Sequence, residues 1–566
     1  MWGLRDQSAD WSWQSVIQLF KEAFACMADK SFKKQSFLQG AAVLAAATAI
    51  VKIIGAIYKI PMQSVIGTAG FGYFNTAYQI YDVLLMISTA GLPVAMSRMI
   101  SEAQALENPN QIRKIFSTAL RVFLTIGVLG TLLMVLFSRQ LSVMMVGHDR
   151  SWAAIMALGP AVLFICVISA FRGFFQGQSN MNPTSISQVF EAICKLVIGL
   201  GAAWLIMKLT YDPAEASGDA ALGAGGAILG VTVGCLVSVV YLYACYRRAV
   251  KELPVGGTVK STGETMKQLL SIAIPITIGS AGLQIINMVD TMVYMRRLVG
   301  AAGILSQRAD ELKGIYDFCR TIFNLPCAFI TPIVVAIIPS ITGHLTMKNE
   351  RGVRLVEGSA MRITALIAAP CAFGLLSLAK PIVDLLTNYS VQDLEVGGVI
   401  MALMGITVVF NSLILVTNAI MQAHGDVNTP VVHMITGGVI KVIANYFLVG
   451  MPELNIVGAA IGTLICYLVI MSLNVIAMIR KKTIDPKSFR GLLKPLLAGA
   501  LMGAVAYMAN GFLSAYVSGS LACLAAICVA AVVYFVLVFA LRVITYEDCM
   551  LLPGGEKIAR ILRVNR

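Results

Sequence analysis

The chain has 566 residues, of which 58% are hydrophobic and only 13% are charged. A soluble globular domain carries roughly a quarter charged residues, so this composition excludes an ordinary soluble protein and indicates a chain that faces lipid over much of its length. The net charge of +14 fits the excess of lysine and arginine in the cytoplasmic loops of membrane proteins, and we expect no nucleic-acid partner.

Residues 1–36 hold tryptophans and phenylalanines beside scattered charges, and they lack the apolar core of a signal peptide. The sequence predicts either an amphipathic helix at the cytoplasmic interface or a disordered N-terminal extension.

Apolar runs of about 20 residues, the length that crosses the hydrocarbon core, recur from residue 37 onward. They predict an all-α polytopic membrane protein with about 14 transmembrane helices. The predicted spans lie at residues 37–60, 74–97, 116–138, 152–171, 184–207, 222–246, 268–294, 316–341, 359–380, 397–421, 430–450, 456–479, 491–511 and 518–543.

Basic loops precede the first span and follow the second, sixth, eighth and twelfth, all on one side of the membrane. This distribution predicts that both termini are cytoplasmic. The loop after the seventh span departs from the pattern, because it is basic on the predicted outer side. A salt-bridged outer loop and a cationic mouth for an anionic ligand both fit its charged residues, which are Arg296, Arg297, Arg308, Lys313, Asp310 and Glu311.

One motif occurs twice. Residues 176–183 (QGQSNMNP) are followed by Lys195, and residues 422–430 (QAHGDVNTP) are followed by Lys441, which comes 246 positions later (441 − 195 = 246). Six spans separate the copies, so both have the same orientation and form a parallel repeat about an axis along the membrane normal.

The repeat predicts two six-helix lobes around a central cavity, followed by two extra helices. The predicted divisions are a cytoplasmic extension at 1–36, an N-lobe at 37–250, a C-lobe at 251–482, two C-terminal helices at 483–545 and a basic cytoplasmic tail at 546–566.

Ionisable residues inside a membrane are costly and require a reason. Lys52 lies near the middle of the first span, too deep for its ammonium to reach water easily. Lys59 follows seven residues later on the same helix face, although beside Pro61 it could reach the outer interface. We expect this face to point into the cavity.

On the fifth span, Glu191 and Lys195 have the spacing and order that favour an ion pair within one helix. Lys441 has Gly437 at the equivalent position. Its charge must therefore be met by another helix, by water or by a ligand, unless its ammonium stands where a related transporter binds a metal cation. Lys441 is thus a sharper candidate than Lys195.

Asp82 on the second span and Asp290 on the seventh either neutralise lysines across the cavity or bind a coupling ion. Asn445 on the eleventh span suits interhelical hydrogen bonding. The predicted substrate-binding residues are Lys52, Lys59, Arg320, Lys441 and Lys195, and the predicted charge-balancing or ion-coupling residues are Asp82, Glu191, Asp290 and Asn445.

The sequence predicts no catalytic or metal site. Its cysteines are scattered without a CxxC pair, and its four histidines lie far apart. We therefore expect neither an enzyme nor a cofactor.

The opening spans resemble the stage V sporulation protein B family of bacterial membrane proteins, which belongs with MurJ-type lipid II flippases in the multidrug/oligosaccharidyl-lipid/polysaccharide exporter (MOP) superfamily. The resemblance covers essentially residues 37–545. It is strongest at residues 50–55 (IVKIIG), 66–72 (IGTAGFG), 90–93 (AGLP), 316–320 (YDFCR), 324–326 (NLP) and 338–340 (IPS).

This resemblance implies a fourteen-helix transporter with a V-shaped cavity, whose last two helices help to form a groove for a lipid tail. It also implies functional cations on the first span, at Lys52 and Lys59, and at the start of the eighth, at Arg320. The arginine pair usual in MurJ near the end of the second span has no match in residues 83–87 (VLLMI), and Arg98 lies too far along. That departure leaves the exact cargo open but not its class.

The leading hypothesis is a flippase that moves an anionic undecaprenyl-linked saccharide, such as a peptidoglycan precursor or polysaccharide unit, across the bacterial plasma membrane by alternating access. Cavity cations would replace the hydration of its pyrophosphate. An inside-negative potential favours outward movement of negative charge by about 2.3 kcal/mol per charge per 100 mV, so we expect membrane potential or a Na⁺ or H⁺ gradient to drive it. The alternatives are a multidrug/cation antiporter of the MATE type and a non-transporting factor for spore or envelope assembly.

Overall fold

The computed structural model describes residues 37–212, 218–387, 389–481, 483–484, 489 and 491–544. The predicted N-terminal extension and basic tail lie outside these residues. The described elements are helices, as the sequence predicts.

The first helix, α2 (Phe37–Met86), runs through the first two predicted spans without an intervening loop. Its direction changes at Gly67, where φ is 72°, a left-handed conformation that glycine adopts without steric cost. A π-turn, η1 (Ile87–Gly91), and helix α3 (Leu92–Ala105) continue it.

In the rest of the N-lobe, α6 contacts both α4 and α9, and α8 packs against α9. Small residues allow close approach between these helices. A side-chain carbon on Gly230 would lie 2.3 Å from the backbone nitrogen of Gly199. The elements are α4 (Pro109–Leu136), α5 (Ser138–Val146), α6 (Trp152–Gly177), α7 (Asn182–Cys194), the π-turn η2 (Lys195–Gly199), α8 (Leu200–Leu209) and α9 (Ala220–Glu252).

The C-lobe is organised around α15, which contacts α11, α12, α13 and α17. Helix α18 packs against α13 and α19 at the edge of this lobe. The elements are α10 (Thr262–Gly300), α11 (Ser306–Phe323), α12 (Leu325–Thr346), α13 (Glu350–Ser377), α14 (Ala379–Leu386), α15 (Val391–Ala423), α16 (Asn428–Leu448), α17 (Val457–Arg480), α18 (Leu493–Leu513) and α19 (Gly519–Ala540).

Eleven helical stretches in the described part of the chain are long and apolar enough to cross a membrane, so the protein is a multi-pass membrane protein. One of them, Tyr58–Ala105, joins parts of the first two predicted spans. Helices α10, α11 and α12 are not among the eleven, and the count of fourteen stays a prediction.

The two copies of the repeated motif form the same helix–turn–helix. Each turn has a left-handed residue at the equivalent position, Ser179 (φ 59°) and Gly425 (φ 86°). The next helices, α7 and α16, begin at the equivalent residues Asn182 and Asn428. The sequence repeat is therefore also a repeat of backbone conformation.

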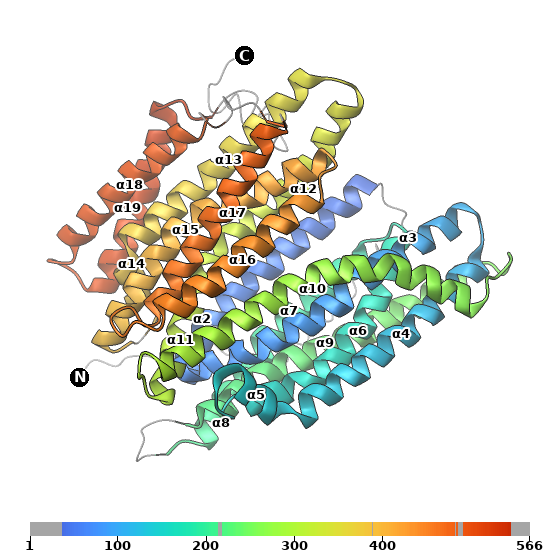
Figure 1. The fold of residues 1–566 in the computed structure, drawn as a ribbon, viewed down its shortest axis with the longest axis horizontal. Coiled ribbons are helices and arrows are strands. Elements are labelled where there is room, and N and C mark those ends of the chain that lie inside the picture. The colour runs from blue at the N-terminus through green and yellow to red at the C-terminus, as the bar shows by residue number, and fades with distance from the viewer. Residues whose placement is uncertain are drawn as a thin grey trace, which may run out of the picture.

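The two lobes lie side by side, with the long helices α2 and α10 between them (Figure 1). Helix α2 contacts α7 and α9 in its own lobe and α10, α11 and α12 in the other. The lobes converge near α2, α5 and α11 and spread apart toward α3 and α13. We call the converging end, which the charge distribution predicts to be extracytoplasmic, the outer end.

Candidate functional site: a charged pocket between the lobes

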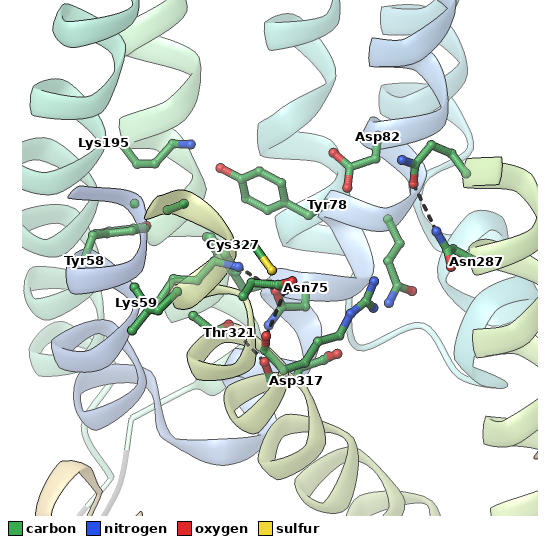
Figure 2. Close-up of a pocket in the computed structure, with 18 of the residues that line it drawn as sticks. Tyr58, Lys59, Asn75, Tyr78, Asp82, Lys195, Asn287, Asp317, Thr321 and Cys327 are labelled. Atoms are coloured by element: carbon green, nitrogen blue, oxygen red, sulfur yellow. Dashed lines mark hydrogen bonds between the residues drawn. The ribbon is translucent and has the colours of Figure 1, made fainter. Parts of the chain in front are cut away.

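A pocket of about 490 Å³ lies between the two lobes. Helix α2 and the π-turn η2 supply its N-lobe wall, and α10, α11 and α12 supply its C-lobe wall (Figure 2). The charged residues that line it are Lys59, Asp82, Lys195, Asp317 and Arg320. The structure thus brings together four of the nine residues that the sequence singled out.

The α2 wall follows from helical spacing. Asn75, Tyr78 and Asp82 recur at intervals of three and four residues, which places them on one face of a helix, and all three line the pocket. Lys59 comes from the part of α2 before the bend at Gly67, and its ammonium donates to Asn75 Oδ1 at 3.4 Å. Lys59 therefore faces the pocket.

Lys195 is the first residue of the π-turn η2, and π-turns of this kind are frequent at functional sites. Its ammonium lies 5.3 Å from the centre of the Tyr78 ring, within the range of a cation–π interaction.

Arg320 lies in the last turn of α11. Among the described residues, Lys59, Lys195 and Arg320 make no ion pair with a carboxylate within 4.0 Å, and Asp82 makes none with a cation. The pocket thus presents three cations whose charge is available to an anion.

Glu191 does not form the ion pair with Lys195 that their spacing favours. Glu191 Oε1 instead accepts a hydrogen bond from Arg172 Nη2 at 2.7 Å. The same guanidinium also donates to Ser187 Oγ, so Arg172 bridges two residues on one face of α7. This contact across helices leaves Lys195 to face the pocket.

The sequence favours Lys441 over Lys195 as a substrate-binding residue. Lys441 nevertheless does not line the pocket. Its ammonium lies 2.8 Å from Asp290 Oδ2, and the two side chains are 10% and 4% exposed. Asn445 donates to the other carboxylate oxygen of Asp290 at 2.6 Å. The charge of Lys441 is therefore met by another helix, within a separate buried cluster.

The cluster of Lys441, Asp290 and Asn445 leaves no room for a side chain at Gly462 of α17. A side-chain carbon on Gly462 would lie 1.9 Å from Asn445 Oδ1. The close approach of α17 allows Asn445 to sit deep enough to reach Asp290.

Lys52 belongs to α2, but its side chain lies outside the described residues. Its role stays a prediction.

Sequence reasoning missed the pair Lys313 and Asp317. The predicted spans place Lys313 in an outer loop, whereas it lies on α11, and its ammonium is 2.6 Å from Asp317 Oδ2. The side chains are 1% and 4% exposed. The sequence does contain a signal for this pair, because Lys313 and Asp317 are opposite charges four residues apart.

Of the other cations of that predicted loop, Arg308 follows the salt-bridged interpretation, whereas Arg297 contacts a backbone oxygen and an aromatic ring. Arg308 contacts Glu311 at 2.8 Å and Asp393 at 2.6 Å. Arg297 donates to the backbone oxygen of Tyr446 at 2.9 Å and lies 4.2 Å from the centre of its ring.

At the outer end, the lobes are joined by a set of contacts that we call the outer closure. Asp310 of α11 receives three N-lobe groups: His148 Nε2 at 2.7 Å, Arg150 Nη1 at 3.7 Å and the Tyr73 hydroxyl at 3.1 Å. Gln63 donates to the Tyr389 hydroxyl across the same boundary.

Helices α2 and α11 also touch directly at the outer closure. A side-chain carbon on Gly314 would lie 1.8 Å from the backbone oxygen of Thr68, and one on Gly72 would lie 2.9 Å from that of Asp310. Lys313 Nζ donates to the Gly72 oxygen at 3.0 Å. The closure thus caps the pocket on its outer side.

The chain is similar to known proteins both in sequence and in fold. The family model described as "Polysaccharide biosynthesis protein" matches residues 37–343. Stage V sporulation protein B of Bacillus subtilis is 26% identical over 433 residues, covering 76% of this chain and 81% of that protein. Lipid II flippase MurJ of the same organism is 25% identical over 447 residues, covering 76% and 80%.

Among solved structures, lipid II flippase MurJ in an inward closed conformation has a TM-score of 0.62 at 14% identity, covering 87% of this chain and 97% of that one. An inward-facing multidrug resistance MATE family transporter of the MOP superfamily has a TM-score of 0.58 at 14% identity, covering 77% and 98%. These likenesses confirm the two-lobed fold that the resemblance implied. With the family match over more than half of its length, the chain belongs to the polysaccharide biosynthesis protein family.

Proposed function

We propose that this protein is a flippase that carries an anionic, lipid-linked saccharide from the inner to the outer leaflet of a bacterial plasma membrane by alternating access. The observation that carries the proposal is the pocket between the lobes, in which Lys59, Lys195 and Arg320 make no ion pair among the described residues. A pyrophosphate can replace its hydration with hydrogen bonds from such cations. The name of one relative, lipid II flippase MurJ, supports the same class of cargo.

In this proposed function, the termini, the two lobes, the last two helices and Lys52 also have roles. Both termini are cytoplasmic, residues 37–250 and 251–482 move as two lobes, and α18 and α19 flank the C-lobe where a lipid tail would lie. Lys52, expected on the same helix face as Lys59, adds a further cation to the cavity.

Purified protein in proteoliposomes tests this function. The probe is a fluorescent undecaprenyl-pyrophosphate disaccharide, and translocation is measured by loss of its accessibility to a quencher on the starting side. We expect Lys59→Ala and Arg320→Ala to slow translocation by about ten- to a hundredfold, because hydrogen bonds to charged groups contribute about 1.5–3 kcal/mol.

Lys208→Ala is the matched control, because Lys208 lies over Trp204 and does not line this pocket. It should translocate at the parental rate. Folded Lys59→Ala and Arg320→Ala variants that also work at the parental rate would refute the phosphate-binding role of the pocket.

The runner-up is a drug or cation antiporter, favoured by the likeness to the MATE transporter and by Asp82 in the pocket wall. Such a protein would export a cationic dye, lose that export in Asp82→Asn and keep it in Arg320→Ala. An assembly factor would move neither probe.

A further inference from the structure

Three charges of α11 divide between the outer closure and the pocket. Lys313, Asp317 and Arg320 recur at intervals of four and three residues, which places them along one face of the helix. Lys313 contacts α2 in the closure, whereas Asp317 and Arg320 line the pocket. Asp317 therefore stands between the two, because it also pairs with Lys313.

On the closure side, the contacts of the Lys313–Asp317 pair require that α2 and α11 touch. Lys313 Nζ contacts both Asp317 Oδ2 at 2.6 Å and the Gly72 backbone oxygen at 3.0 Å. A charge this deeply buried is tolerated only with a close counter-charge and satisfied hydrogen bonds. Loss of the carboxylate would leave a buried ammonium held by a single carbonyl.

On the pocket side, the same carboxylate lines the cavity together with Lys59 and Arg320, the cations that the proposed cargo needs. Figure 2 draws Lys59, Asn75 and Asp317 around one region of the pocket. Asp82, the other carboxylate of the wall, makes no contact with Lys313 among the described residues. Only Asp317, of these two, reaches the closure.

We propose that Asp317 is a specificity-determining residue that holds Lys313 in the outer closure and releases it only when an anionic cargo in the pocket repels the Asp317 carboxylate. This inference rests on the proposed function. A pyrophosphate in the pocket takes over Lys59 and Arg320, and its negative charge repels Asp317. The repulsion moves α11 away from α2, and Lys313 leaves the Gly72 oxygen.

The proposal explains how the protein distinguishes a charged cargo from a neutral lipid of the same length. A neutral polyprenol can enter the pocket but brings no charge that repels Asp317 from Lys313, so the lobes stay joined. Like charges brought together in a poorly hydrated site repel strongly, and a pyrophosphate supplies that repulsion.

Opening of the outer closure is measured by the rate at which an introduced cysteine reacts with a maleimide. Gln63→Cys replaces a side chain that is 3% exposed beneath Tyr389, and a membrane-impermeant maleimide is added on the outer side of full-length protein in vesicles. The same protein with Gln63 intact gives the background from native cysteines. The probes are undecaprenyl pyrophosphate and undecaprenol.

We expect undecaprenyl pyrophosphate to raise the labelling rate of the introduced cysteine by about tenfold, which corresponds to about 1.4 kcal/mol, and undecaprenol to leave it unchanged. Asp317→Asn should be labelled rapidly without any lipid and gain nothing from the pyrophosphate. Glu357→Gln is the matched control, because Glu357 is a buried carboxylate that pairs with His424 and lies outside the pocket lining and the closure. It should stay as closed as the parent without lipid.

A second variant separates coupling from simple damage. Lys313→Gln combined with Asp317→Asn leaves no unpaired buried charge at the contact between α2 and α11, so the variant should stay closed and bind undecaprenyl pyrophosphate without opening. Binding is measured independently, by retention of radiolabelled lipid on the purified protein.

The two proposals fail in different ways. If the parent does not retain undecaprenyl pyrophosphate, the proposed function is wrong. If the parent retains it while labelling of the introduced cysteine is unchanged, or if Asp317→Asn still responds to it, the role of Asp317 is wrong and the flippase proposal stands.

Discussion

At the scale of single residues, equivalent positions of the repeat carry different chemistry. Lys195 and Lys441 occupy the same place in the two copies, yet Lys195 lines the pocket and Lys441 is held by Asp290. The difference arises from their neighbours. Glu191 is taken by Arg172 from α6, while Asp290 of α10 reaches Lys441 with the help of Asn445. One lysine is available to an anion and the other is permanently neutralised.

The buried cluster predicts a large effect on stability. Lys441→Met leaves Asp290 as an unpaired buried charge, and removal of one partner of a buried ion pair costs about 3–5 kcal/mol. Thermal unfolding in detergent measures the loss. The double variant Asp290→Asn with Lys441→Met should recover most of it, because no charge remains to be desolvated.

Lys208→Met is the control, since its cation–π contact with the exposed Trp204 ring is of a type that contributes about 0.5–1 kcal/mol. A Lys441→Met protein as stable as the Lys208→Met protein would contradict the account of the cluster.

At the scale of elements, helix α11 shows where prediction from the sequence stops. Most spans are recognisable because lipid-facing helices need long apolar runs. Helix α11 faces the other lobe and not lipid, so its polar residues, among them Asp310, Lys313 and Asp317, are buried against protein. The hydropathy of such a helix is as low as that of a loop. The predicted eighth span therefore begins at residue 316, and the first ten residues of α11 are assigned to a loop.

The site is predictable to a similar degree. A charge in an apolar run identifies Lys59, Lys195 and Asp82 as residues that must face a cavity. Which charges meet depends on distances between helices, and those depend on contacts such as Gly462 beneath Asn445. Sequence spacing therefore could not find the Arg172–Glu191 and Asp290–Lys441 pairs.

The contact between α2 and α11 gives an element-scale prediction. In Gly314→Ala the added carbon would meet the backbone oxygen of Thr68, which cannot move aside as a flexible side chain could. The outer closure must separate, so the cysteine of the Gln63→Cys labelling experiment should react faster without lipid. Gly343→Ala on α12 is the control, because its added carbon meets nothing within 4 Å. Equal labelling of the two variants would show that this contact does not hold the lobes together.

At the scale of the whole molecule, the arrangement is a pocket closed at one end by contacts between two lobes that spread apart at the other (Figure 1). The closure includes polar groups that meet across the boundary, such as Asp310 with His148. Polar contacts of this kind can exchange with water when the lobes part, whereas a large apolar interface could not do so cheaply. Such contacts would let the lobes part in the alternating access proposed above.

Transport of an anion by this molecule should depend on voltage. In proteoliposomes with a potassium diffusion potential, 100 mV that is negative on the starting side should accelerate translocation of the pyrophosphate-linked probe, because each net negative charge gains about 2.3 kcal/mol. Reversing the potential should slow it. A rate that ignores both potentials but follows an imposed Na⁺ or H⁺ gradient would assign the driving force to that ion.

The bend at Gly67 has a consequence for how cargo preference changes. Lys59 lies in the helical segment before this residue, and Asn75, Tyr78 and Asp82 lie in the segment after it. The spacing between these groups is therefore set by the backbone angles of a single glycine. Substitution or insertion at this one position would widen or narrow the reach of the N-lobe wall while every binding side chain stays the same. A lineage could in this way adjust to a longer or shorter head group without rebuilding its pocket.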